Sequence, residues 1–173
     1  MAKPTAIGGT MTSVQAVGTV SAPPVTFHRL YLPDGGFFQL HLDAEGQPDE
    51  CRYFSVFDNI TPGNEEDWRF WLDRAEGLIG WPEFQTKDGK SYGRRWNAGP
   101  ARIAPRRLDE RIETARNELS SVAQAMLYAA PIGAPPPAPS DEYILVEAIE
   151  QQGQAWVRIS AGLDINPASL SLA

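Results

Sequence analysis

Short runs in which hydrophobic and polar residues alternate recur along the chain and predict strands more often than helices. Residues 27–32 (FHRLYL) and 37–42 (FFQLHL) flank the turn sequence PDGG at 33–36. An Asp-Gly pair between two apolar runs is the strongest short-range hairpin signal. A third alternating run, residues 51–57, follows soon after. Together the three runs predict an antiparallel meander.

The same alternation predicts a first strand and two further hairpins. The strand covers residues 13–20, which are rich in Val and Thr. The two hairpins turn at an Asp-Gly and a Gln-Gly pair, and they join 83–87 to 90–96 and 142–150 to 155–161. In the second hairpin a two-residue turn places Glu147 opposite Arg158, which is a favourable cross-strand pair.

One amphipathic helix is predicted over residues 64–76. Thr61 followed by Pro62 offers an N-cap and a first helical residue, and Gly77 offers a C-terminal turn. Within the segment an apolar stripe recurs at i, i+3, i+4 and i+7, formed by Trp68, Trp71, Leu72 and Ala75. We expect this stripe to pack against the sheet.

The whole pattern predicts an α+β protein that is β-rich, with antiparallel hairpins, a meander and the helix at 64–76 packed on the sheet. Residues 112–130 are ambiguous, because their apolar side chains recur at near-helical spacing and their propensity alone favours a helix. Residues 1–12 are small, polar and Gly-rich and are expected to be flexible. Residues 13–173 are expected to form one domain with a Pro-rich loop at 131–140.

Composition narrows the class of protein. Cys51 is the one cysteine of 173 residues, so no internal disulfide can form, and we expect it to be a small buried side chain rather than a reactive thiol. No apolar run is long enough to cross a bilayer and no secretory signal opens the chain, so we expect a cytoplasmic protein without direct membrane insertion. The formal net charge of −7 repels nucleic acid, which is therefore not an expected partner.

Positive charge is concentrated in one segment. Residues 87–116 carry nine basic and four acidic residues, a net charge of +5, so the rest of the chain carries −12. Such asymmetry predicts a docking face for an acidic protein partner, since guanidinium groups suit carboxylates. The predicted basic patch consists of Arg94, Arg102, Arg106, Arg107 and Arg111, and we expect Arg94, Arg106 and Arg107 to be exposed. The alternative is that these arginines pair internally with acids.

The aromatic residues of the helix have two interpretations. Trp71 belongs to the apolar stripe and is expected to lie at the seam between helix and sheet. The alternative is a partner groove in which Phe70 and Trp71 act as aromatic anchors.

Catalytic or metal chemistry depends on two histidines. Neither His28 nor His41 lies in a nucleophile or metal-binding motif, so no common enzyme signature is present and no cofactor is expected. A two-residue turn at the first Asp-Gly pair would set His28 opposite His41, and a similar turn at the next Glu-Gly pair would add Glu50 to the same row. Two imidazoles and a carboxylate could hold a divalent metal. The alternative is a polar pair on a solvated face.

Several segments follow one another in a distinctive order, namely YLPDGGFFQL (31–40), NEEDWRFWL (64–72), LIGWPEF (78–84), DGKSYGRRW (88–96), AMLY (125–128), EYILV (142–146) and AGLDI (161–165). This order resembles the YjfK-like family of uncharacterised bacterial proteins. The resemblance implies a bacterial cytoplasmic protein of unknown activity, often encoded near a phage-shock-protein-A-like coiled-coil protein. It also implies strand at 120–130, and it carries over no catalytic residues.

Three function classes follow from these observations. The leading hypothesis is a non-enzymatic interaction module whose acidic partner is a phage-shock-protein-A-like coiled-coil protein of a membrane-stress system. The first alternative is a metal-dependent enzyme or metal sensor that uses His28, His41 and Glu50. The second is a binder of a small ligand in a pocket between sheet and helix.

Overall fold

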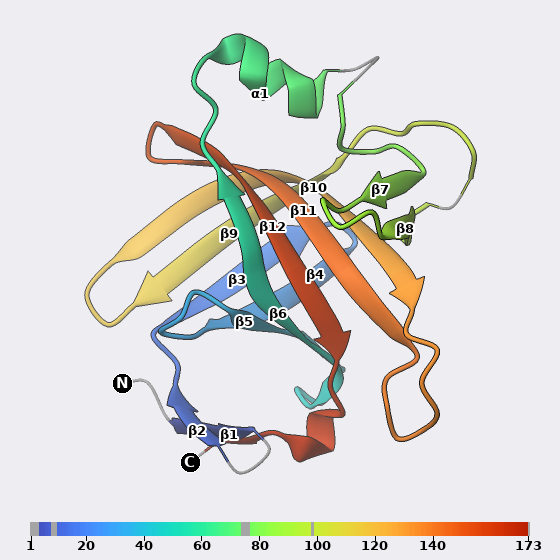
Figure 1. Ribbon diagram of the computed structural model, residues 1–173. Helices are drawn as coiled ribbons and strands as arrows, with labels where there is room; N and C mark the ends of the chain where they lie inside the picture. Colours follow the sequence, from blue (N-terminus) through green and yellow to red (C-terminus); the bar gives the residue numbers. More distant parts are fainter. Residues whose placement is uncertain (1–3, 8–9, 74–76, 98, 173) are drawn as a thin grey trace.

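Eight antiparallel strands close into a barrel in the computed structural model, which describes residues 4–7, 10–73, 77–97 and 99–172 (Figure 1). Each strand pairs with the next around the ring, and the last pairs with the first. In ring order the strands are β3 (Ala16–Ala22), β4 (Val25–Tyr31), β5 (Phe37–Leu42), β6 (Pro48–Ile60), β12 (Gln154–Asp164), β11 (Asp141–Gln151), β10 (Glu118–Pro131) and β9 (Arg106–Thr114).

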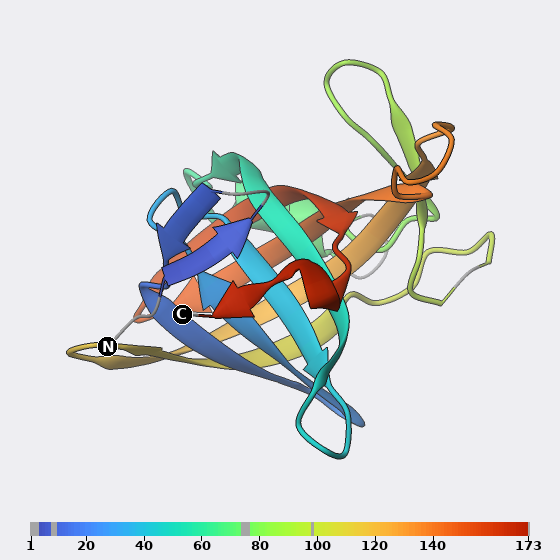
Figure 2. The same ribbon diagram turned by 90° about the horizontal axis from the view of Figure 1, so that it is seen from below.

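Smaller elements decorate the barrel. A ribbon of β7 (Glu83–Gln85) and β8 (Ser91–Arg94) pairs with the C-terminal part of β10. A separate sheet joins β1 (Pro4–Ile7), β2 (Thr10–Ser13) and β13 (Ser171–Leu172), and it lies away from α1 (Glu65–Leu72), as Figure 1 and Figure 2 show. A short 3-10 turn, η1 (Pro167–Ser169), precedes β13.

The expected α+β architecture, with a helix packed on a sheet, is wrong, because the fold is a closed, mostly β barrel, with one short α-helix in the part of the chain that the structure describes. Closure depends on pairings between strands that are distant in sequence, such as β3 with β9 and β6 with β12. Alternation within one segment predicts a strand but carries no signal for its distant neighbour. The sequence pattern therefore predicts the hairpins but not the long-range pairings that close the barrel.

The ambiguous residues 112–130 form the end of β9, a turn at 115–117 and most of β10, so the strand that the family resemblance implies at 120–130 is confirmed. In β10 both faces are apolar, because Ala123, Ala125 and Leu127 face the barrel interior whereas Met126 packs in a second cluster on the outside. A strand that is buried on both faces lacks strict alternation, and its apolar spacing then mimics a helix.

The helix is shorter than the predicted 64–76. Asn64, not Thr61, provides the N-cap, since its side chain accepts a hydrogen bond from the Asp67 backbone N–H at 2.8 Å. The helix ends at Leu72, and Ala75 lies outside the described residues.

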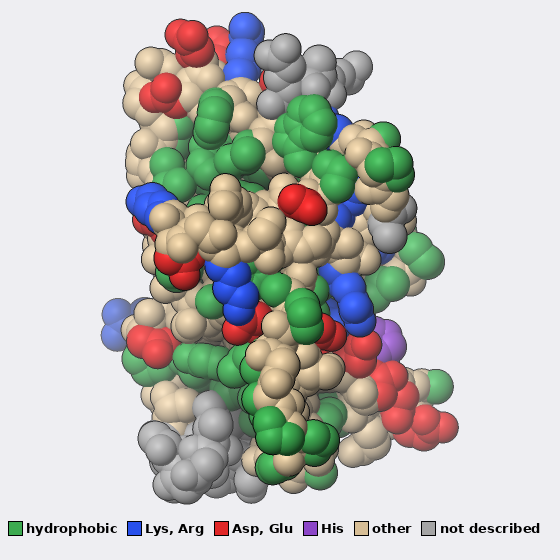
Figure 3. All heavy atoms as spheres, turned by 45° about the vertical axis from the view of Figure 1, so that its right-hand side comes forward, with side chains coloured by type: hydrophobic (Ala, Val, Ile, Leu, Met, Phe, Trp, Pro, Cys, Tyr) green, Lys and Arg blue, Asp and Glu red, His purple; other side chains and the backbone are tan. Residues whose placement is uncertain are grey.

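Apolar side chains form a large interior cluster, a large outer cluster and a small third cluster that contains Leu32, Phe38, Leu40 and Cys51. The interior cluster fills much of the barrel and includes Phe27, Phe37, Phe54, Leu108 and Leu145. The outer cluster packs α1, the segment that follows it, and the β7–β8 ribbon onto β10, β11 and β12; its members include Trp71, Ile79, Phe84, Tyr128 and Ile144. In Figure 3 apolar side chains gather in the upper part of the molecule. Trp71 therefore helps to cover the barrel wall, as a core residue rather than an exposed anchor.

A network of charged side chains occupies the middle of the barrel. Arg29 Nη1 donates to Glu110 Oε1 and to Glu147 Oε2, at 3.0 Å each. Arg158 Nη2 donates to Glu147 Oε1 at 2.8 Å, as the predicted pairing of these two residues requires. All four side chains come from the central parts of their strands. A side chain at Gly18 would displace the Glu110 carboxylate from its hydrogen bonds with Arg29 and Tyr31.

Candidate binding pocket at the barrel mouth

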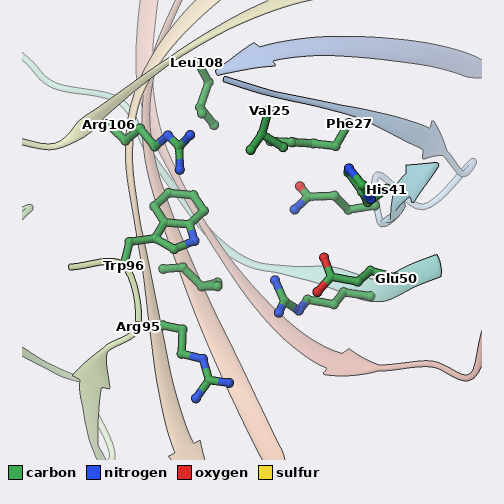
Figure 4. A pocket seen from close by; sticks show the side chains of 11 residues that line it. Val25, Phe27, His41, Glu50, Arg95, Trp96, Arg106 and Leu108 are labelled. Atoms are coloured by element: carbon green, nitrogen blue, oxygen red, sulfur yellow. The ribbon is translucent and has the colours of Figure 1, made fainter. Parts of the chain in front are cut away.

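One end of the barrel opens into a cavity of about 380 Å³ (Figure 4). Its floor is apolar and consists of Phe27, Leu108 and Leu127, whose side chains also belong to the interior cluster. The charged network in the middle of the barrel contacts this floor, because the Arg29 guanidinium lies over the Phe27 ring with 5.6 Å between Cζ and the ring centroid. The cavity is thus a shallow mouth rather than a channel through the barrel.

Inward-facing positions of several strands supply the polar wall of the cavity. β5 contributes Gln39 and His41, and β6 contributes Glu50 and Arg52. The spacing of two within each pair keeps both side chains on the inner face of the sheet.

The segment after β8 completes the wall. Arg95 and Trp96 line the cavity, and the backbone N–H of Arg95 donates to the Leu127 carbonyl oxygen at 2.8 Å. This bond fixes the segment against β10. Figure 4 shows Arg95, Trp96 and Arg106 on one side of the cavity, with His41 and Glu50 across from them.

Arg106 is held in place but keeps free donors. Its Nη2 donates to the Ala22 carbonyl oxygen at 2.7 Å, and its Cζ lies 5.7 Å from the centroid of the Trp96 ring. A guanidinium carries five N–H donors, so further donors of Arg106 remain for a molecule in the cavity.

Arg52 is oriented by two neighbours. Its Nε donates to Asp164 Oδ1 at 3.2 Å, and its Cζ lies 4.5 Å from the centroid of the Tyr143 ring. The Tyr143 hydroxyl donates to Asp164 Oδ2 at 2.7 Å. Burial and this hydrogen bond raise the pKa of Tyr143, so the hydroxyl stays protonated and keeps donating near neutral pH.

Arg95 and Glu50 differ from these residues because neither has an ion-pair or side-chain hydrogen-bond partner among the described residues. Both side chains are exposed at the rim. Beside Glu50, His41 Nδ1 lies 2.6 Å from Asp49 Oδ1. The cavity therefore presents the guanidinium groups of Arg95 and Arg106 on one side and, on the β5–β6 side, the Arg52 guanidinium, the Glu50 carboxylate and the His41 imidazole.

The predicted three-residue metal site does not form. The first hairpin closes between Leu32 and Gly36 and so pairs His28 with Leu40, one position away from the expected register. His28 therefore lies on the outer face of the barrel, whereas His41 lies on the inner face. The predicted pairing of His41 with Glu50 is confirmed. Within the described ranges, no group of three His, Cys, Asp or Glu side chains could hold a metal ion.

Cys51 is buried, as expected. Burial, with a smaller effect of Asp164, raises the pKa of its thiol to about 12, which keeps it protonated and unreactive at neutral pH.

The predicted basic patch is dispersed in the structure. The expected exposure of Arg94 is wrong, because it is only 8% exposed and its guanidinium donates to the carbonyl oxygens of Gly80, Asn97, Gly99 and Ala101. Arg102 likewise donates to backbone carbonyl oxygens, those of Gly77 and Ile79.

The remaining arginines of the patch separate between two faces of β9. Arg107 pairs with Asp109, and Arg111 pairs with Glu113 and Glu118, all on the outer face. Arg106 faces inward and lines the cavity. The alternation of a strand thus divides residues that the sequence places side by side.

Sequence reasoning missed Arg52 and Trp96 as pocket residues, and it considered Arg95 only as part of the basic segment. Alternation along a strand predicted over 90–96 would separate Arg95 from Arg94, but β8 ends at Arg94, and Arg95 reaches the cavity from the segment that follows. Nothing in the local pattern of Arg52 shows that it shares a cavity with either residue.

Comparison with known proteins gives one match. The model of a family described as "Protein of unknown function (DUF2491)" matches residues 3–171. Neither the search of curated proteins nor that of solved structures found a match. The comparisons do not confirm the YjfK-like name that the sequence order suggests. Among the described residues, no helix has the length and apolar character needed to span a membrane.

Proposed function

Since the chain belongs to the DUF2491 family of proteins of unknown function, we propose its activity from the geometry of the barrel mouth: it binds a small organic anion that carries an apolar part. The observation that supports this proposal is the convergence of Arg52, Arg95 and Arg106 on one cavity from three separate segments. A small-ligand binder with a pocket between sheet and helix is one of the hypotheses from the sequence. Here the proposed pocket lies at the mouth of the barrel instead.

The arginines favour an anion. Each guanidinium is planar, remains charged at any physiological pH and can bind a carboxylate or phosphate through two parallel hydrogen bonds. The Arg95 side chain has no hydrogen-bond or ion-pair partner within the described residues, and Arg106 donates from Nη2 to the Ala22 carbonyl oxygen. Among the lining residues the one carboxylate is that of Glu50, and outside the lining Asp164 pairs with Arg52, so Arg95 and Arg106 are the charges that remain for a ligand.

The floor favours an apolar group on the same ligand. Phe27, Leu108 and Leu127 present a surface that water solvates poorly, and Trp96 adds an aromatic wall. A volume of about 380 Å³ lies within the range of small-molecule sites in proteins. Closed eight-stranded barrels have an interior wide enough to hold one small ligand.

The hypothesis of an acidic protein partner depended on an exposed basic patch, and the arginines of that patch do not form one continuous surface. Arg94 and Arg102 bind backbone carbonyls, while Arg107 and Arg111 pair with acids at the surface. An acidic coiled-coil partner of the phage-shock type remains a prediction from the family resemblance. Our proposal does not depend on it.

A fluorescent probe tests the proposal. 1-Anilinonaphthalene-8-sulfonate combines an anionic group with an aromatic body, and we expect saturable binding with one site per chain. Arg95→Gln combined with Arg106→Gln should weaken that binding about tenfold or more, because charge-assisted hydrogen bonds are lost. The measurement is a fluorescence titration, with circular dichroism to verify the fold.

The matched control is Arg107→Gln combined with Arg111→Gln, two exposed arginines on the outer face of β9. This control should bind the probe like the unmodified protein. Absence of saturable binding, or equal affinity in all three proteins, would contradict the proposed function.

A further inference from the structure

Two opposite charges face the same cavity without meeting. Arg95 and Glu50 both line the mouth, and the described residues provide neither with an ion-pair partner within 4.0 Å. Figure 4 shows them on opposite sides, with Glu50 near His41 and Arg95 beyond Trp96. Charges that could reach each other would gain by pairing, so the cavity keeps these two apart.

The acidic side extends beyond Glu50. A carboxylate oxygen of the neighbouring Asp49 lies 2.6 Å from His41 Nδ1. The hairpin between β5 and β6 also carries Asp43 and Glu45. The side of Arg95 and Arg106 is basic. Arg52 lies two residues from Glu50 on β6, but its charge is paired with Asp164. A molecule in this cavity therefore experiences a positive potential on the side of Arg95 and Arg106 and a negative potential near Glu50.

A ligand that carries only a negative charge pairs with the basic side of the cavity and not with the acidic side. It binds the guanidinium groups, but it leaves the Glu50 carboxylate unpaired and repelled by the ligand. A ligand with an added ammonium group converts that repulsion into an attraction. Discrimination of this kind, in which an unpaired charge penalises the wrong ligand, is a common source of specificity.

We propose that the mouth pocket binds an amino-acid-like zwitterion with an apolar side chain. Its carboxylate binds Arg95 and Arg106, its ammonium group binds Glu50, and its side chain contacts Phe27 and Leu108 on the floor. This inference rests on the proposed function and specifies the class of ligand for the same site.

Three matched probes separate the two charges of the ligand. L-Phenylalanine carries both charges, 3-phenylpropionate carries only the carboxylate, and phenethylamine carries only the ammonium group. We expect isothermal titration to show that phenylalanine binds about tenfold more tightly than either single-charge probe, because one charge-assisted contact is worth about that factor.

Glu50→Gln tests the assignment of the ammonium site. This variant should bind phenylalanine about tenfold more weakly, and it should bind 3-phenylpropionate as well as or better than the unmodified protein does. Glu45→Gln, on the same hairpin but outside the cavity, is the matched control and should change neither affinity.

The outcomes distinguish this inference from the proposed function. If 3-phenylpropionate binds as tightly as phenylalanine, or if Glu50→Gln leaves the preference unchanged, the ligand is not a zwitterion and the anion proposal stands. The same holds if phenylalanine fails to bind to a protein that binds the anilinonaphthalene probe through Arg95 and Arg106. If that probe also fails to bind, the proposed function is overturned as well.

Discussion

Glu147→Gln is expected to lower the free energy of unfolding by about 3–5 kcal/mol, because it removes the one carboxylate that two buried arginines share. Glu147 is fully buried, and it accepts hydrogen bonds from Arg29 and from Arg158. Without its charge, both guanidinium groups remain in the barrel interior with less compensation. Denaturation by urea, monitored by tryptophan fluorescence, measures the change.

The matched control is Glu150→Gln on the same strand, where the side chain is exposed. Its effect should stay within about 0.5 kcal/mol, as is usual for surface positions. A loss of less than 1 kcal/mol for Glu147→Gln would mean that the network contributes little to stability.

The same variant has a predicted pH dependence. Burial alone raises the pKa of Glu147, but the charges of Arg158 and Arg29 outweigh it and hold the pKa below its ordinary value of 4.5. A depressed pKa in the folded state stabilises the fold above the unfolded pKa, and this stability is lost as the pH falls through the folded pKa. The stability curves of the unmodified protein and Glu147→Gln should therefore begin to approach each other as the pH falls below about 4.5, and they should meet only below the folded pKa of Glu147.

Trp71→Ala should cost about 3–5 kcal/mol, the range for large aromatic side chains removed from a core. Trp71 is only 8% exposed and packs in the outer cluster that covers β10, β11 and β12. Its carbonyl oxygen also accepts a hydrogen bond from the Ile79 N–H at 3.1 Å, which ties the helix to the segment after it. Chemical denaturation again provides the measurement.

The adjacent residue provides the control. Phe70 is 61% exposed and contacts Trp71 edge-on, with 5.6 Å between the ring centroids. Phe70→Ala should therefore cost about 1 kcal/mol or less. If the two substitutions cost the same, α1 does not cover the barrel as the structure shows.

Local pairings could be predicted from the sequence. The run-turn-run patterns indicate the hairpins β4–β5 and β11–β12, and turn length alone places Glu147 opposite Arg158. The predicted register is wrong at the first Asp-Gly turn, where the loop is one residue longer than expected and places His28 on the other face of the strand. Because side chains alternate along a strand, an error of one residue removed an entire predicted site.

Closure and the pocket could not be predicted in the same way. Arg52, Arg95 and Arg106 lie on separate segments and meet only because the strands close into a ring. Arg29 and Glu110 are similar, since they pair across 81 residues of sequence. Turn chemistry and alternation act over a few residues, whereas these contacts depend on long-range pairing.

The most direct test of ligand binding at the barrel mouth is a nitrogen-proton NMR titration with the anilinonaphthalene probe. The five tryptophans report from different parts of the molecule, and only the Trp96 indole lines the cavity. We predict that the signals of the Trp96 indole and of the Arg95 and Arg106 Nε–H groups shift in a saturable way, while those of Trp68 and Trp71 stay in place. Shifts confined to Trp68 and Trp71 would place the probe on the outer cluster and contradict the account.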